Sequence, residues 1–136
     1  MVKAMRQSLT PFLMFTQGGC EAAIKFYVSL FPDSRIDSIA HYPEDGSPNS
    51  GLVMMAAFTL NGRPYRANDS VGFHKFDFTP SFSIFVECKD LEEIEHLFEI
   101  LGDGGLALMP LDNYGFSRRF GWVQDRFKVS WQLNLA

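Results

Sequence analysis

The segment PFLMFTQGGCEAAIKFYVSLFPDSR, residues 11–35, decides the fold, because a related pattern returns in SFSIFVECKDLEEIEHLFEILGDGG, residues 81–105. A shift of seventy residues aligns the two segments without a gap. Under that shift apolar positions coincide, and the pairs include Phe12 with Phe82, Phe15 with Phe85 and Ile24 with Ile94. Such self-similarity is typical of a duplicated supersecondary unit. Two copies of one unit are therefore expected.

Each copy opens with a strand and continues as a helix. Phe12–Thr16 and Phe82–Glu87 are apolar runs of strand length. Apolar residues then recur at spacings of three and four, first as Ala22, Ala23, Phe26, Tyr27, Leu30 and Phe31, and later as Leu91, Ile94, Leu97, Phe98 and Leu101. These stripes predict two amphipathic helices. Pro32 is expected to end the first helix, and Asp90 is expected to cap the second.

Three further strands are expected after each helix. Their ranges are Arg35–His41, Leu52–Leu60 and Pro64–Asn68 in the first copy, and Ala107–Leu111, Phe116–Gln124 and Val129–Leu135 in the second. Asn61-Gly62 predicts a tight hairpin between the last two strands of the first copy. Asp125-Arg126 lies at the equivalent turn of the second copy.

The sequence thus predicts an α+β fold made of two tandem βαβββ units. The first unit is expected over residues 8–69 and the second over residues 80–136, with a connection at 70–79. At 136 residues the chain has the size of one ordinary domain. The two units are expected to form, within that single domain, a curved mixed sheet with a cleft.

Composition narrows the function classes. A net charge of −4 repels phosphate backbones, so nucleic acid is not an expected partner. No apolar run is long enough for a signal peptide or a membrane span, and a cytoplasmic protein with no membrane partner is expected. Cys20 and Cys88 lack CxxC spacing, so both are expected to be buried thiols rather than disulfide or zinc ligands.

Several phrases carry a family resemblance. They are TPFLMF (10–15), AAIKFY (22–27), LFPDS (30–34) and NDS (68–70), followed by NYG (113–115), FGWVQDRF (120–127) and VSWQL (129–133). They resemble the PhnB-like family of the vicinal oxygen chelate superfamily, which includes glyoxalases, bleomycin-resistance proteins and dihydroxybiphenyl dioxygenases. The resemblance implies the duplicated βαβββ fold and leaves the reaction open, because this scaffold hosts lyases, isomerases, dioxygenases and drug-sequestering proteins. One departure is Lys128, where the family pattern has glycine.

Some members of this family carry the label "3-demethylubiquinone-9 3-methyltransferase". The residues give that label no support, because no strand–GxGxxG–helix unit is present and 136 residues cannot hold the usual nucleotide-binding domain. No S-adenosylmethionine binding and no cofactor are expected.

Metal-dependent relatives take four ligands, usually His and Glu, from the first and fourth strands of each unit. By this resemblance Gln132 occupies the position of the terminal glutamate ligand, and Asn68 is its repeat partner. Residues 12–15 and 81–86 offer no His, Cys, Asp or Glu. Neutral amides are poor ligands for divalent cations, so no metal is expected.

Strand alternation selects the candidate site residues. On the last strand Val129, Trp131, Leu133 and Leu135 should face the helices, which leaves Ser130, Gln132 and Asn134 toward the cleft. The ligand-binding candidates are Phe12, Met14, Arg66, Asn68, Ser81, Tyr114, Trp122 and Gln132.

Asp69 and His74 are the candidate general bases. A turn or helix-cap carboxylate is an equally good interpretation of Asp69, and a packed imidazole is a better one for His74.

Two functions follow from these residues. The first is a small-molecule-binding protein with a degenerate metal site and no assigned reaction. The alternative is a lyase, an isomerase or a metal-assisted enzyme of the glyoxalase type. A purely structural role would leave the concave sheet unexplained. A homodimer is expected, because an open edge strand is an aggregation liability that symmetric pairing covers.

Overall fold

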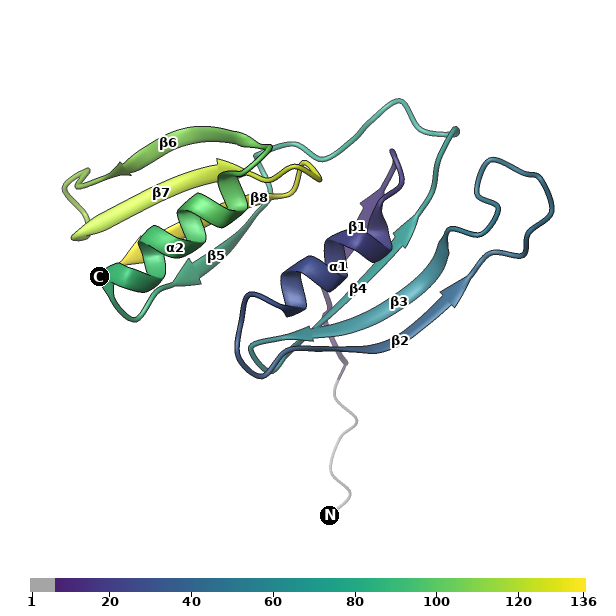
Figure 1. Cartoon of the computed structure of the whole chain (residues 1–136), viewed down its shortest axis with the longest axis horizontal. Helices are drawn as coiled ribbons and strands as arrows, with labels where there is room; N and C mark the ends of the chain where they lie inside the picture. Colours follow the sequence, from purple (N-terminus) through teal and green to yellow (C-terminus); the bar gives the residue numbers. More distant parts are fainter. Residues whose placement is uncertain (1–6) are drawn as a thin grey trace, which may run out of the picture. The chain divides into compact units, whose positions relative to one another are not determined.

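The computed structural model describes residues 7–136, which form two compact units that divide between Lys75 and Phe76. Unit 1 ends at Lys75, and unit 2 runs from Phe76 to Ala136. Each unit has the element order β-α-β-β-β (Figure 1). The predicted α+β fold of two tandem βαβββ units is therefore confirmed. The division lies inside the predicted connection 70–79, and the arrangement of both units as one domain with a shared curved sheet stays a prediction.

Unit 1 contains a four-stranded mixed sheet and one helix. Its elements are β1 (Phe12–Phe15), α1 (Cys20–Val28), β2 (Arg35–His41), β3 (Val53–Leu60) and β4 (Arg63–Asp69). The strand order is β1-β4-β3-β2, with β1 parallel to β4 and the other neighbours antiparallel. Asn61 and Gly62 join β3 to β4 with φ angles of 51° and 79°. Positive φ at both positions is the requirement of a tight hairpin turn, so the predicted hairpin is confirmed.

Unit 2 repeats this topology. Its elements are β5 (Ser83–Glu87), α2 (Leu91–Gly102), β6 (Leu106–Asp112), β7 (Arg119–Gln124) and β8 (Ser130–Leu135). The strand order is β5-β8-β7-β6, and β5 is parallel to β8. Asp90 caps α2 as predicted, since its carboxylate accepts a hydrogen bond from the Glu93 N–H at 2.8 Å.

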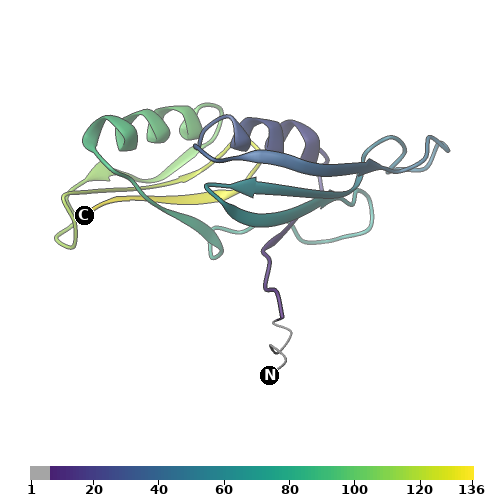
Figure 2. The ribbon, with the colours of Figure 1, turned by 90° about the horizontal axis from the view of Figure 1, so that it is seen from below.

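In each unit the helix lies over one face of its sheet (Figure 2). In unit 1 the buried side chains on this side include Leu13 and Phe15 of β1, Phe58 of β3 and Ile24 and Tyr27 of α1, all at most 2% exposed. In unit 2 they include Val123, Trp131 and Leu133 from the sheet and Ile94, Leu97 and Leu101 from α2. Both predicted cysteines are buried, with Cys20 at 0% and Cys88 at 7% exposure. Each unit thus has its own apolar core between helix and sheet.

Helix α1 is shorter than predicted. It ends at Val28 instead of continuing to Pro32, because Ser29 closes it through its N–H and hydroxyl, both of which donate to the Phe26 carbonyl. The buried side of the helix also differs from the predicted stripe. It contains Cys20 and Ile24, whereas Ala22 is exposed.

The gap-free alignment of the two copies is wrong in the first strand. Phe15 is 2% exposed on the helix side of its sheet, whereas Phe85 is 53% exposed on the opposite side. The register shows the true equivalence, since Met14 pairs with Asn68 and Phe85 pairs with Gln132. The connection from β1 to α1 has four residues, 16–19, and that from β5 to α2 has three, 88–90. Equivalent strand positions such as Met14 and Phe85 are thus 71 residues apart, whereas the buried helix residues Ile24 and Ile94 are 70 apart.

None of the helices in the described residues is long and apolar enough to cross a membrane.

Candidate functional site

The candidate site of each unit is the sheet face opposite its helix, which we call the open face of that unit (Figure 2). Successive side chains of a strand point to opposite faces, so alternate residues of every strand reach the open face.

The open face of unit 1 carries four of the predicted ligand-binding residues. Phe12 pairs with Arg66 and Met14 pairs with Asn68, and these four alternate along β1 and β4 with residues buried toward α1, such as Leu13 and Ala67. The row that contains Phe12 and Arg66 continues through Ala57 on β3 to Ser38 on β2.

The polar groups of this face lack partners among the described residues. The Asn68 side-chain oxygen is buried and accepts no hydrogen bond. Arg66 is exposed, and its guanidinium forms no ion pair with any carboxylate of residues 7–136. The Arg66 guanidinium is therefore available to a ligand, whereas the buried Asn68 oxygen is not.

The open face of unit 2 is organised in three cross-strand rows. The rows are Ser83, Ser130 and Gln124, then Phe85, Gln132 and Trp122, then Glu87, Asn134 and Phe120. This register agrees with the predicted orientation of Ser130, Gln132 and Asn134, whose side chains point away from the helix. Ser130 and Asn134 are nevertheless buried at 2% and 8% exposure, so Gln132 is the accessible polar side chain of β8.

Hydrogen bonds fix the aromatic wall beside Gln132. The Trp122 indole N–H donates to the Ser130 hydroxyl at 2.7 Å, and that hydroxyl lies 2.8 Å from the Ser83 hydroxyl. Phe85, directly across from Gln132, is 53% exposed. The Gln132 amide itself forms no hydrogen bond with the described residues. A free amide thus lies between two aromatic rings, one of them held in place.

Tyr114 lies at the end of this face, in the loop between β6 and β7. Its hydroxyl donates to the Pro110 carbonyl at 2.6 Å. Its ring centroid is 6.3 Å from that of Phe116 and 6.2 Å from that of Phe120. Because Phe120 belongs to the third row, Tyr114 extends the aromatic surface beyond the strands.

Ser81 is not on the open face. It precedes β5, and its hydroxyl lies 2.6 Å from that of Thr79. The serine that β5 does place on the face is Ser83, which pairs with Ser130. Alternation from Phe85 along the strand identifies it.

Asp69 faces the helix side of its sheet and is 1% exposed. Its carboxylate accepts hydrogen bonds from the backbone N–H of Cys20 at 3.0 Å and of Val53 at 2.9 Å. The carboxylate therefore ties the first turn of α1 and the start of β3 to the end of β4. Burial, and then the negative charges of Asp69 and Glu21, raise the pKa of the Cys20 thiol to about 12. These contacts fit the interpretation of Asp69 as a helix-cap carboxylate, and a role for it as a general base stays a prediction.

His74 lies in the segment after β4. Its Nε2 atom is 2.9 Å from the Ser70 hydroxyl, and the side chain is half-buried. This contact fits the interpretation as a hydrogen-bonded imidazole, and a role for His74 as a general base stays a prediction.

Glu87 is a carboxylate on the open face that the sequence interpretation missed. It accepts a hydrogen bond from the Asn134 side-chain amide at 3.0 Å. The Asn134 oxygen is buried without a partner among the described residues. Residues 7–136 contain no group of three or more His, Cys, Asp or Glu side chains placed to hold a metal ion.

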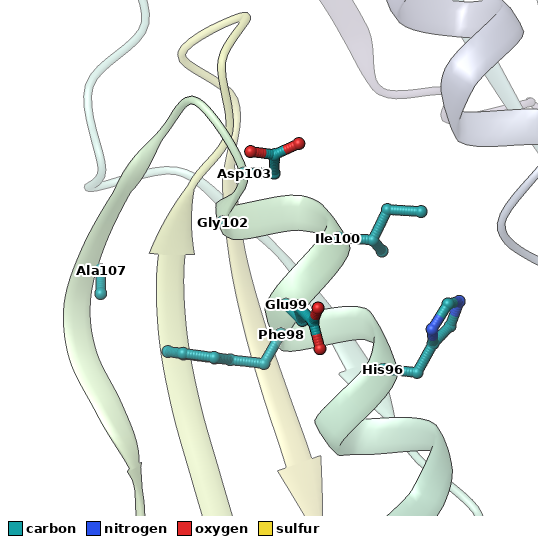
Figure 3. A pocket seen from close by; sticks show the side chains of 7 residues that line it. All are labelled: His96, Phe98, Glu99, Ile100, Gly102, Asp103 and Ala107. Atoms are coloured by element: carbon teal, nitrogen blue, oxygen red, sulfur yellow. The ribbon is translucent and has the colours of Figure 1, made fainter.

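Two hollows lie away from the open faces. One, of about 720 Å³, follows α2 and is lined by His96, Phe98, Glu99, Ile100, Gly102, Asp103 and Ala107. Figure 3 shows that Phe98 points toward Ala107 of β6 while His96 projects from another side of the helix, so the polar groups do not converge. The other, of about 110 Å³, lies at the start of α1 beside Asp69. Binding sites combine an apolar wall with a few convergent polar groups, and the open faces fit that description better.

Comparison with known proteins relates the whole chain to one family. The family model described as "3-demethylubiquinone-9 3-methyltransferase" matches residues 7–134. The structure of the PhnB protein from Bacillus cereus, which carries the same description, is 48% identical, has a TM-score of 0.90 and covers 96% of this chain and 100% of its own.

Two more distant matches also cover almost the whole chain. Protein YjdN from Escherichia coli is 23% identical over 94% of this chain and 95% of its own length. A glyoxylase/bleomycin resistance protein/dioxygenase domain from Frankia sp. is 13% identical, with a TM-score of 0.62 and coverage of 98% of this chain and 99% of its own.

Proposed function

The chain belongs to the PhnB-like family described as 3-demethylubiquinone-9 3-methyltransferase, and from the geometry of its open faces we infer that it is a small-molecule-binding protein. The glyoxalase/bleomycin-resistance fold supports this inference without fixing a reaction, because one fold hosts many functions.

The observation that carries the proposal is the row Phe85, Gln132 and Trp122 on the open face of unit 2. Aromatic side chains stack on planar rings with a gain of about 0.5–1.5 kcal/mol per pair beyond the buried area. The unpaired Gln132 amide offers two N–H donors and a carbonyl acceptor between them. A planar ligand with its own donor and acceptor at one edge fits this row.

Fluorescence titration with N-phenyl-1-naphthylamine, an uncharged probe with a planar naphthalene ring and an N–H donor, tests the proposal. We expect saturable binding that Phe85→Ala weakens by about tenfold, since truncating a central aromatic contact costs more than about 1 kcal/mol and 1.4 kcal/mol is a factor of ten. Phe73→Ala is the matched control, because Phe73 is 69% exposed and lies in the connection from β4 to β5. Absence of saturable binding, or equal losses in both variants, would refute the proposal.

A second candidate, an enzyme of the glyoxalase type, is favoured by Glu87. This carboxylate lies on the open face and accepts, among the described residues, one side-chain hydrogen bond, from Asn134, so it has lone pairs left to accept a proton. Turnover of the hemithioacetal of methylglyoxal and glutathione, abolished in Glu87→Gln, would favour the enzyme. No turnover with or without added divalent metal would leave binding as the function.

The proposal includes a cytoplasmic location and a homodimer. The dimer is expected to bury more than roughly 1,200 Å² in total, the lower bound for stable specific interfaces. Sedimentation equilibrium at micromolar concentration measures this, and a single species of 15.4 kDa would exclude the dimer.

A further inference from the structure

The open face of unit 1 differs from that of unit 2 in charge. Its first row is Phe12, Arg66, Ala57 and Ser38, and its second includes Met14, Asn68, Met55 and Ala40. None of these eight side chains is acidic, and Arg66 supplies one positive charge. The protein as a whole has a net charge of −4, so this face is locally cationic on an acidic molecule.

The charge of Arg66 is not neutralised within the described residues. The acid that reaches this side of the sheet is Asp37, whose carboxylate accepts from the Thr59 hydroxyl at 2.7 Å. Asp37 is already paired with Arg35, whose Nε lies 2.8 Å from its carboxylate. No ion pair links Arg66 to any acid of residues 7–136.

Asn68 adds a second polar group beside Arg66. The two residues are two apart on β4, so their backbones are about 7 Å from each other along the strand and both side chains reach the same face. The Asn68 oxygen is the buried and unpartnered end of the amide. That orientation leaves its NH₂ group as the end available for donation, next to the five N–H donors of the guanidinium.

The remaining side chains of the face are apolar or small. Phe12 is 45% and Met55 is 37% exposed, which are high values for such side chains. Ala57, which pairs with Arg66, and Ser38, which pairs with Ala57, are short. An apolar body can therefore lie across the centre of the sheet and contact Phe12 and the methylene stem of Arg66 together.

From this charge complementarity we propose that the open face of unit 1 binds an organic anion, with an apolar body on Phe12, Ala57 and Met55 and its anionic head held by the Arg66 guanidinium. The head is a planar or tetrahedral oxyanion, such as a carboxylate, sulfonate or phosphonate, which a guanidinium binds through two parallel N–H···O bonds. The inference rests on the proposed function, because it names the ligand class of one of the two open faces.

A pair of probes that differ only in an anionic group tests the proposal. 8-Anilinonaphthalene-1-sulfonate is N-phenyl-1-naphthylamine with one sulfonate added. Both are titrated in the Phe85→Ala background, which reduces the contribution of unit 2. We expect the sulfonate to bind more tightly than the uncharged probe, and added salt to weaken only the sulfonate.

Arg66→Gln should weaken the sulfonate about tenfold or more and leave the uncharged probe unchanged, since hydrogen bonds to charged groups contribute about 1.5–3 kcal/mol. Arg66→Lys should restore part of the affinity, because it keeps the charge and loses the two-pronged contact. Arg63→Gln is the matched control, as Arg63 lies on the same strand, is exposed and alternates to the opposite face.

A second variant pair tests the site through a different strand. Ala57→Glu places a carboxylate directly across from Arg66 and should abolish sulfonate binding, whereas Ala57→Gln, of similar size, should retain most of it. Equal effects of Arg66→Gln and Arg63→Gln, or equal affinity for both probes, would overturn the anion proposal alone. Failure of both probes to bind the wild-type chain would overturn the proposed function as well.

Discussion

The role assigned to Asp69 is tested by Asp69→Asn, which keeps the size of the side chain and removes its charge. The two carboxylate oxygens accept from the N–H groups of Cys20 and Val53, at 3.0 and 2.9 Å. A carboxamide has one oxygen, so it can accept from one of these groups only. Its NH₂ group would then face the other backbone N–H, donor against donor.

The magnitude follows from these two contacts. Hydrogen bonds to a charged acceptor contribute about 1.5–3 kcal/mol each, and neutral ones contribute about 1 kcal/mol. Losing one bond, and reducing the other to a neutral one, should lower the free energy of unfolding by about 3 kcal/mol. For a chain of 136 residues this corresponds to a melting temperature about 10 °C lower.

Urea unfolding followed by circular dichroism measures this change. Asp103→Asn is the control, because Asp103 is exposed just beyond α2, and we expect its effect to stay within about 0.5 kcal/mol. Binding of the uncharged probe by folded Asp69→Asn should be unchanged. An equally stable Asp69→Asn that no longer binds the probe would show that the carboxylate serves the ligand rather than the fold.

Three further predictions concern the thiols, a strained turn and metal content. Burial raises the pKa of both Cys20 and Cys88 to about 12, so iodoacetamide at pH 8 should label neither thiol until the chain unfolds. The stability gained from these protonated thiols should decline as the pH rises above their pKa in the unfolded chain, which is near 9. Labelling of the native protein at the rate of a free thiol would contradict this prediction. Lys128 has a φ of 75°, and this left-handed region costs a residue with a side chain about 1 kcal/mol. Lys128→Gly should therefore raise the midpoint of urea unfolding. A lower midpoint would show that other contacts of Lys128 outweigh the strain. After metal-free dialysis elemental analysis should find no stoichiometric metal; one tightly held ion per chain that is lost in Gln132→Ala would disprove this.

The duplicated fold could be predicted because each copy changes from strand to helix period at the same point. The exact equivalence could not, because the strands match at a shift of 71 residues and the buried helix positions at a shift of 70, and a slip of one residue exchanges the two faces of a strand. That slip equated the buried Phe15 with the exposed Phe85.

The last strand was predicted correctly because its alternation of large apolar and polar residues is strong. Trp131 and Leu133 are fully buried, and Gln132 between them reaches the open face. Asp69 was different, since its partners Cys20 and Val53 lie 49 and 16 residues away in the sequence. Local turn chemistry indicates a carboxylate at a strand end but carries no information on which distant N–H groups require an acceptor.

The corrected register shows how the two copies have diverged at equivalent positions. Phe12 and Arg66 in unit 1 correspond to Ser83 and Ser130 in unit 2, because each pair is joined across the same parallel strands. In unit 2 the two hydroxyls bond to each other, and that of Ser130 also accepts a hydrogen bond from the Trp122 indole N–H, which orients the aromatic ring. In unit 1 the same positions hold an exposed ring and a guanidinium without an ion-pair partner among residues 7–136. Among the described residues neither this guanidinium nor the Gln132 amide of unit 2 forms a hydrogen bond that packing requires, and ligand binding gives each of these solvent-accessible groups a use.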